Sequence, residues 1–192
     1  MRPHDPYVAW VGASVVAGVV VSLVNIAGVP LLGAAFLALA PALILSPIVA
    51  MFEGNPVLWI AMTLLGVAVT VGATYLTFVL LFVGLGALLP TLWPGASSAP
   101  LWTLPVVAAL ACFIGAFPLG VLQRYALPAV RGAWSFPLAT MLGAAALSPL
   151  VLAIINAPVD RTPILGAFGG LVYGMATATA LGRAYAARPD IT

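Results

Sequence analysis

Hydrophobic residues run through this chain in long uninterrupted stretches, and short segments that hold the charged residues separate them. The longest stretch extends from Gly54 to Gln123, seventy consecutive residues without Asp, Glu, Lys or Arg. A helix that crosses a bilayer needs about 20 residues. The segment 90–100 contains three prolines and cannot continue a helix. The stretch therefore predicts two membrane spans joined as a hairpin, and its charged borders, Glu53 and Arg124, lie on the same side of the membrane.

The rest of the pattern predicts four further spans. The interval 6–52 is also free of charge and is divided at 27–30 by the segment Ala-Gly-Val-Pro. The predicted spans are residues 7–27, 31–51, 57–89, 101–122, 134–156 and 164–184. The third is longer than one crossing requires, so it must tilt, protrude or break near Gly84-Leu85-Gly86. We expect an all-α fold, in which residues 1–192 form a single polytopic transmembrane helical bundle of six spans.

The arginines predict how this bundle is oriented. With six spans, five arginines fall on the side of the two termini and one, Arg161, on the other. Positive charge accumulates on the cytoplasmic side of membrane proteins, so both termini are predicted to be cytoplasmic, in the cytoplasmic (inner) membrane of a bacterium. Tryptophans are expected to form interfacial belts: Trp10, Trp59 and Trp134 on the cytoplasmic side, with Trp93 and Trp102 on the other.

Composition supports the membrane class, since 64% of the residues are hydrophobic and only ten are charged. The small positive net charge reflects orientation rather than nucleic-acid binding, because the arginines stand singly at span ends. The first apolar stretch, residues 7–29, exceeds the hydrophobic region of a signal peptide, so we expect an uncleaved span. The expected partners are membrane lipid and other membrane-protein subunits or further copies of the chain.

The last span carries small residues at every fourth position. They are Gly166, Gly170, Gly174, Ala178 and Gly182. Such a stripe lets two helices approach closely in lipid. It predicts either packing within the chain, with the span that holds Ala9, Ala13 and Ala17 as a partner, or a subunit interface.

Two Ser-Pro pairs occupy similar positions in the second and fifth spans, at Ser46-Pro47 and Ser148-Pro149. Proline leaves a carbonyl without its donor, and the neighbouring hydroxyl can satisfy that carbonyl or bind a ligand. The equivalence suggests two inverted halves of three spans, as in many transporters, with chance similarity as the alternative. Asn25 is a further candidate for ligand binding within a span.

Three threonines share a face of the third span at helical spacing, Thr70, Thr74 and Thr77. Each hydroxyl is expected to bond to the carbonyl four residues earlier, and the alternative is a polar pathway. Glu53 is expected in an interfacial turn, where pairing with Arg124 or Arg131 is open.

The chain lacks the motifs of enzymatic chemistry. It has no HExxH, no phosphate-binding glycine-lysine loop and no nucleophile elbow, and its single histidine, His4, precedes the first span. We therefore predict no catalytic residue, no metal site and no enzyme, and the sequence points to no particular cofactor. Two functions remain: an accessory, structural subunit of a larger membrane complex, or a passive conduit or membrane-embedded binding component of a transporter for an uncharged or apolar solute.

Overall fold

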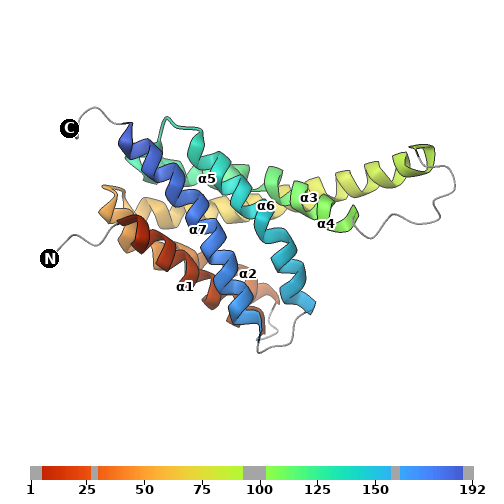
Figure 1. Ribbon diagram of the computed structural model, residues 1–192, viewed down its shortest axis with the longest axis horizontal. Coiled ribbons are helices and arrows are strands. Elements are labelled where there is room, and N and C mark those ends of the chain that lie inside the picture. Colours follow the sequence, from red (N-terminus) through yellow and green to blue (C-terminus); the bar gives the residue numbers. More distant parts are fainter. Residues whose placement is uncertain (1–5, 27–29, 93–102, 157–160, 188–192) are drawn as a thin grey trace.

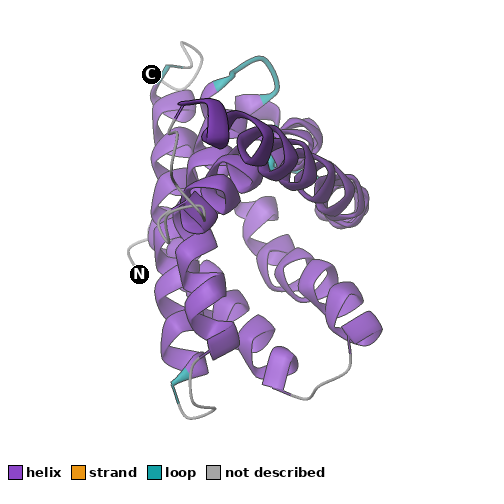
Figure 2. Ribbon diagram, turned by 90° about the vertical axis from the view of Figure 1, so that its right-hand side faces the viewer, coloured by secondary structure: helices purple, strands orange, loops and turns teal. Residues whose placement is uncertain are grey.

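The computed structural model describes residues 6–26, 30–92, 103–156 and 161–187, and within these ranges the fold is helical and contains no strand (Figures 1 and 2). The helices are α1 (Pro6–Ile26), α2 (Pro30–Met51), α3 (Pro56–Leu92), α4 (Thr103–Gly115), α5 (Phe117–Gln123), α6 (Ser135–Asn156) and α7 (Thr162–Ala186). Two short 3-10 turns, η1 (Arg124–Ala126) and η2 (Pro128–Val130), lie between α5 and α6. The all-α class is confirmed, and the helix ends lie close to the predicted ones.

Proline marks the beginning of each of these α-helices. It is the first, second or third residue in every case, at Pro6, Pro30, Pro56, Pro105, Pro118, Pro137 and Pro163. The first four N–H groups of a helix have no acceptor within the helix, so a residue without an N–H group loses nothing there. The prolines of this apolar chain therefore set where each helix starts.

The helices form a bundle that closes on itself. Helices that are consecutive along the chain pack together, with α4 and α5 occupying one position between α3 and α6, and α7 returns to pack along α1. The two described ends of the chain lie at the same end of the bundle, on the left in Figure 1. We call this the terminal end; it also holds the α2–α3 turn and the segment from η1 to η2.

Helix α3 is continuous over its 37 residues, so the prediction of a possible break near Gly84 is not realised. At 1.5 Å per residue it is about 55 Å long, nearly twice the thickness of a bilayer core. It crosses the direction of α1 and α7 obliquely and, together with α4, projects beyond the other helices (Figure 1). Both of the other predicted solutions, tilt and protrusion, are therefore present.

The fourth predicted span, residues 101–122, is wrong as a single helix. Helix α4 ends at Gly115, Ala116 forms a turn and α5 begins at Phe117. Pro118 explains the interruption, because it has no N–H group to continue the α4 ladder. The two pieces still form one apolar segment, from Thr103 to Ala126, that is long enough to cross a membrane.

An aromatic cluster fills the core near the terminal end. Its rings are those of Tyr7, Trp10, Phe52, Trp59, Phe136 and Tyr185. Trp10 lies at its centre, with ring centroids 5.4 Å from Trp59 and 6.4 Å from Phe136. Trp10 and Trp59 are 0% exposed, so the prediction that they belong to an interfacial belt is wrong. Position along a span gives the depth of a side chain but not the face it occupies. Trp134 is exposed, and Trp93 and Trp102 lie outside the described residues.

The part of the chain that the structure describes contains four helical segments long and apolar enough to cross a membrane. They are Pro6–Leu23, Pro56–Leu88, Thr103–Ala126 and Thr162–Ala186. Long apolar side chains cover much of their outer surfaces, as expected where lipid is the solvent. The protein is therefore a multi-span integral membrane protein by the length and composition of its helices.

Candidate functional site

The small-residue stripe of α7 lies against α1. A Cβ atom on Gly170 would be 2.7 Å from the carbonyl carbon of Ser14, and one on Gly166 would be 2.7 Å from Cβ of Ser22. Gly18 makes the reciprocal approach to the backbone of Gly166 and Gly170. The two backbones are in direct contact, which only residues without a Cβ permit.

The face of α1 in this contact differs from the one the sequence suggested. It is formed by Ser14, Gly18 and Ser22 rather than by Ala9, Ala13 and Ala17. Further along α7, Gly174 also approaches Ser14, and Ala178 is buried in the core. Gly182 has only the ring of Tyr7 nearby, at 3.7 Å, so close packing ends before the terminal end.

The two Ser-Pro pairs make the same local bond. The hydroxyl of Ser46 donates to the carbonyl of Leu43 at 2.9 Å, and that of Ser148 donates to the carbonyl of Ala145 at 2.9 Å. Each carbonyl lies four residues before the proline, at Pro47 or Pro149, and would otherwise have received its N–H. The serines thus replace the missing backbone donors, and α2 and α6 continue through both prolines. Their hydroxyl protons are not left for a ligand.

The three threonines that share a face of α3 have different surroundings. The hydroxyl of Thr70 is buried and has no hydrogen-bond partner among the described residues, so the expected bond to the carbonyl four residues earlier is wrong for Thr70. Thr74 packs against Gly115 of α4, where a Cβ atom would be 2.7 Å from Cα of Thr74. Thr77 is partly buried farther along α3. The side chain of Asn25 lies outside the described residues, so it is not placed relative to these groups.

A buried polar network joins four helices at a site that the sequence analysis missed. The amide nitrogen of Gln123 in α5 donates to the hydroxyl of Thr63 in α3 at 3.2 Å. The hydroxyl of Tyr173 in α7 donates to the amide oxygen of Gln123 at 3.3 Å. Thr140 of α6 lies beside the Tyr173 hydroxyl, and its own hydroxyl donates to the carbonyl of Phe136 at 3.0 Å. We call the four residues Gln123, Thr63, Tyr173 and Thr140 the Gln123 network.

The network lies deep in the protein. Gln123 is 3% exposed, and Thr63 and Thr140 are buried as completely. Gly120 brings α5 close to α6, since a Cβ atom there would be 2.7 Å from Cα of Pro137. A primary amide can donate and accept at once, so Gln123 connects helices that are distant in the sequence. The sequence places Gln123 at the border of a span, and the one signal it offers is an amide beside Arg124 at the end of an apolar stretch.

Two indole groups near this network differ in their bonding. The N–H of Trp10 donates to the hydroxyl of Thr177 at 2.9 Å, and that hydroxyl donates to the carbonyl of Tyr173 at 2.8 Å. The N–H of Trp59 is buried and has no hydrogen-bond partner among the described residues. An unpaired buried donor is unfavourable by about 1–3 kcal/mol.

The α2–α3 turn at the terminal end is built by two helix caps. Glu53 has a positive φ of 55°, and Gly54 N–H bonds to the carbonyl of Val49 at 2.9 Å, which ends α2 in a Schellman motif. The side chain of Asn55 accepts from the N–H of Leu58 at 3.0 Å and caps α3. The N–H of Asn55 also donates to the carbonyl of Ala126 at 3.0 Å, which ties the turn to η1.

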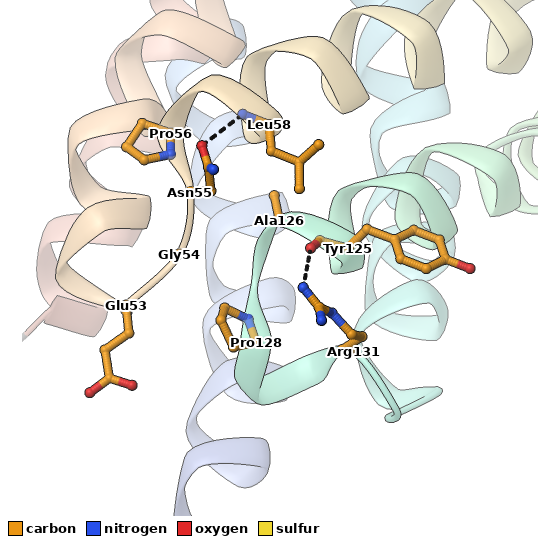
Figure 3. A pocket seen from close by; sticks show the side chains of 9 residues that line it. All are labelled: Glu53, Gly54, Asn55, Pro56, Leu58, Tyr125, Ala126, Pro128 and Arg131. Atoms are coloured by element: carbon orange, nitrogen blue, oxygen red, sulfur yellow. Dashed lines mark hydrogen bonds between the residues drawn. The ribbon is translucent and has the colours of Figure 1, made fainter.

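An open pocket of about 470 Å³ lies between this turn and the segment that follows η1 (Figure 3). Its lining includes Asn55, Tyr125 and Arg131, and Nη2 of Arg131 donates to the carbonyl of Tyr125 at 3.3 Å. The Glu53 carboxylate points away from Arg131 in Figure 3. The pairing that the sequence left open between Glu53 and Arg131 is therefore not adopted.

No group of three or more His, Cys, Asp or Glu side chains that could hold a metal ion occurs among the described residues. The comparisons add no family: no protein-family model, no curated protein and no solved structure matches the chain.

Proposed function

We propose that this protein is a non-enzymatic accessory subunit of a larger complex in the bacterial cytoplasmic membrane, and that α3 is the helix it offers to its partners. The observation that carries the proposal is how little of α3 the bundle covers. In an 18-residue window of its apolar segment Pro56–Leu88, 6% of the residues are buried within the chain, against 39% in a window of the same length in Thr162–Ala186 of α7.

The orientation proposed with this function has six crossings and both termini in the cytoplasm. The η1–η2 segment, with Arg124 and Arg131, and the last turn of α7, with Arg183, lie at the terminal end, whereas Arg161 precedes the first turn of α7 at the opposite end. This distribution supports a cytoplasmic terminal end under the positive-inside rule.

The closed contact between α1 and α7 supports the choice of α3 as the partner surface. The glycines that allow helices to approach closely are occupied on α7, whereas a Cβ atom on Gly72 or Gly86 of α3 would meet nothing within 4 Å. Long apolar side chains flank these glycines, including Tyr75, Leu76 and Phe82. A second transmembrane helix can approach α3 at these positions.

Site-specific photo-crosslinking in membranes of the native host tests the proposal. A photoreactive residue at Leu76 of α3 is compared with one at Phe168 of α7, because their exposed fractions are similar, 60% and 54%. We expect a discrete protein adduct from Leu76 and none from Phe168. Lipid adducts alone at both positions, or the same protein adduct at both, would contradict an α3 interface.

The Gln123 network favours the second function, a passive conduit or binding component for an uncharged solute. It gathers amide and hydroxyl groups from α3, α5, α6 and α7 inside the bundle. Reconstituted vesicles test this function by the rate of glycerol-driven swelling. A conduit predicts swelling faster than in protein-free vesicles and altered by Gln123→Leu, whereas an accessory subunit predicts no difference.

A further inference from the structure

An arginine held between aromatic rings lies on the outer surface at the terminal end. The guanidinium carbon of Arg124 is 4.6 Å from the ring centroid of Trp134 and 5.6 Å from that of Tyr125. Trp134 in turn stacks on Phe117, with ring centroids 6.0 Å apart and planes 5° from parallel. All three rings are exposed to a large degree. Flat contacts of this kind hold a guanidinium in place.

A second cation lies on the other side of Tyr125. The ring of Tyr125 contacts Arg124, while its carbonyl accepts from Nη2 of Arg131. Within the described parts of the chain, neither arginine pairs with a carboxylate, and Glu53 points away from Arg131 (Figure 3). The Nε–H of Arg124 is buried and has no acceptor within the described ranges. Tyr125 thus contacts two positive charges, one through its ring and one through its carbonyl, and neither has a carboxylate partner among the described residues.

The surface between these arginines and the middle of the membrane is apolar. The apolar segment Thr103–Ala126 ends just after Arg124, which places the guanidinium at the level of a membrane interface. Exposed side chains continue from it toward the bilayer on α4 and α6, among them Ile114, Leu110, Leu138 and Leu142. Helices α4 and α6 pack side by side, so this surface is continuous.

From this arrangement we propose that the Arg124–Trp134 site binds the phosphate of an anionic glycerophospholipid. Arg124 and Arg131 contact the headgroup, and an acyl chain lies along α4 and α6. A zwitterionic lipid carries its own cation beside the phosphate, whereas an anionic lipid balances the two uncompensated arginines. The preference is therefore for net negative headgroups rather than for phosphate alone.

The first test uses the full-length chain in a non-ionic detergent, with bound lipid counted by native mass spectrometry. Phosphatidylglycerol and phosphatidylcholine with identical acyl chains are titrated separately, and inorganic phosphate is added as a competitor. We expect phosphatidylglycerol to bind at least about fivefold more tightly than phosphatidylcholine, which corresponds to the attraction between an anionic lipid surface and about one arginine. Inorganic phosphate at the same concentration should not displace phosphatidylglycerol. Equal binding of the two lipids, or displacement by inorganic phosphate, would overturn the proposal.

Variants then locate the site. Arg124→Gln is expected to weaken phosphatidylglycerol binding about fivefold. The control Arg183→Gln removes an exposed charge from the same end, where no ring contact of the arginine occurs among the described residues, and should change phosphatidylglycerol binding less than about twofold. Arg124→Lys keeps the charge but loses the stacked plane, so it should remain at least about threefold weaker than wild type. Equal losses of phosphatidylglycerol affinity in Arg124→Gln and Arg183→Gln would overturn the site. Wild-type affinity in Arg124→Lys would overturn it too, because either result would mean that the lipid responds only to the overall positive charge. If Arg124→Gln does not fold, Arg131→Gln replaces it under the same criteria.

Discussion

Gly170 of α7 faces the backbone of Ser14 in α1 so closely that a Cβ atom on Gly170 would lie 2.7 Å from the Ser14 carbonyl carbon. No side-chain rotation can relieve such an overlap, because the backbone fixes the position of a Cβ atom and the Ser14 carbonyl carbon belongs to the main chain. The contact closes the bundle between its first and last helices. Packing of this kind, rather than a hydrophobic force, holds helices together in lipid.

The first prediction concerns this contact. Gly170→Ala should lower the free energy of unfolding by about 1–3 kcal/mol, because the added methyl separates α1 from α7. Gly182→Ala, in the same stripe, meets nothing closer than the ring of Tyr7 at 3.7 Å, so it should be neutral or stabilising by up to about 1 kcal/mol. Unfolding of both variants in mixed micelles of SDS and a mild detergent measures the difference. Equal effects at the two glycines would show that the α1–α7 contact is not as close as described.

The Gln123 network gives the second prediction. Gln123→Leu makes the core more apolar, yet it should destabilise the protein by about 1–3 kcal/mol, since it leaves Thr63 and Tyr173 without their partner. Combining it with Tyr173→Phe should restore part of the loss, through a coupling energy of about 0.6–1.7 kcal/mol. A double-mutant cycle in the same micelles measures this coupling. Strict additivity would mean that the two side chains do not interact.

The Ser-Pro pair of α6 provides a third prediction. Ser148→Ala removes the donor that satisfies the Ala145 carbonyl and should destabilise the protein by about 1 kcal/mol. In a Pro149→Ala background the backbone N–H of residue 149 can supply that donor, so the same serine substitution should have almost no effect. Thermal unfolding of the four proteins in detergent compares the two effects. An undiminished effect in the Pro149→Ala background would point to a role of the Ser148 hydroxyl other than satisfying this carbonyl.

The fourth prediction compares Trp10 and Trp59, which are both 0% exposed. Trp10→Phe loses a hydrogen bond to Thr177, whereas Trp59→Phe removes a donor that has no partner in the part of the chain that the structure describes. Both substitutions leave a similar cavity, so Trp10→Phe should be more destabilising by about 1 kcal/mol. The paired unfolding free energies test this. A larger loss at Trp59 would mean that its N–H is bonded in the folded protein.

The positions of the helices could be predicted from the sequence, because the length of an apolar stretch is set by the bilayer and prolines mark the starts. The face that each helix turns toward the core could not be predicted. Helices α1 and α3 are apolar on every side and have no periodicity that separates core from lipid, so the sequence does not show that Trp10 and Trp59 are buried rather than interfacial. Pro118 was overlooked for a related reason: hydropathy does not change where α4 gives way to α5.

The residues of the candidate site were harder to predict from the sequence than the helices. Ser46, Ser148 and the threonines of α3 were chosen as polar residues within spans, but the two serines bond to their own helices. Gln123 lies at a span end, and its partners Thr63 and Tyr173 are 60 and 50 residues away in sequence. Nothing local signals that three such residues meet, because only the packing of α3, α5 and α7 brings them together.

The most direct test of the whole account is the accessibility of single thiols at the two ends of α7. Arg161→Cys and Arg183→Cys are introduced separately in a Cys112→Ala background, and intact cells are treated with a membrane-impermeant maleimide. The account predicts that the thiol at position 161 is labelled from outside and that the thiol at position 183 is labelled only after the membrane is opened. Labelling of both thiols from the same side would contradict a membrane-spanning α7 and, with it, the bundle that α7 closes.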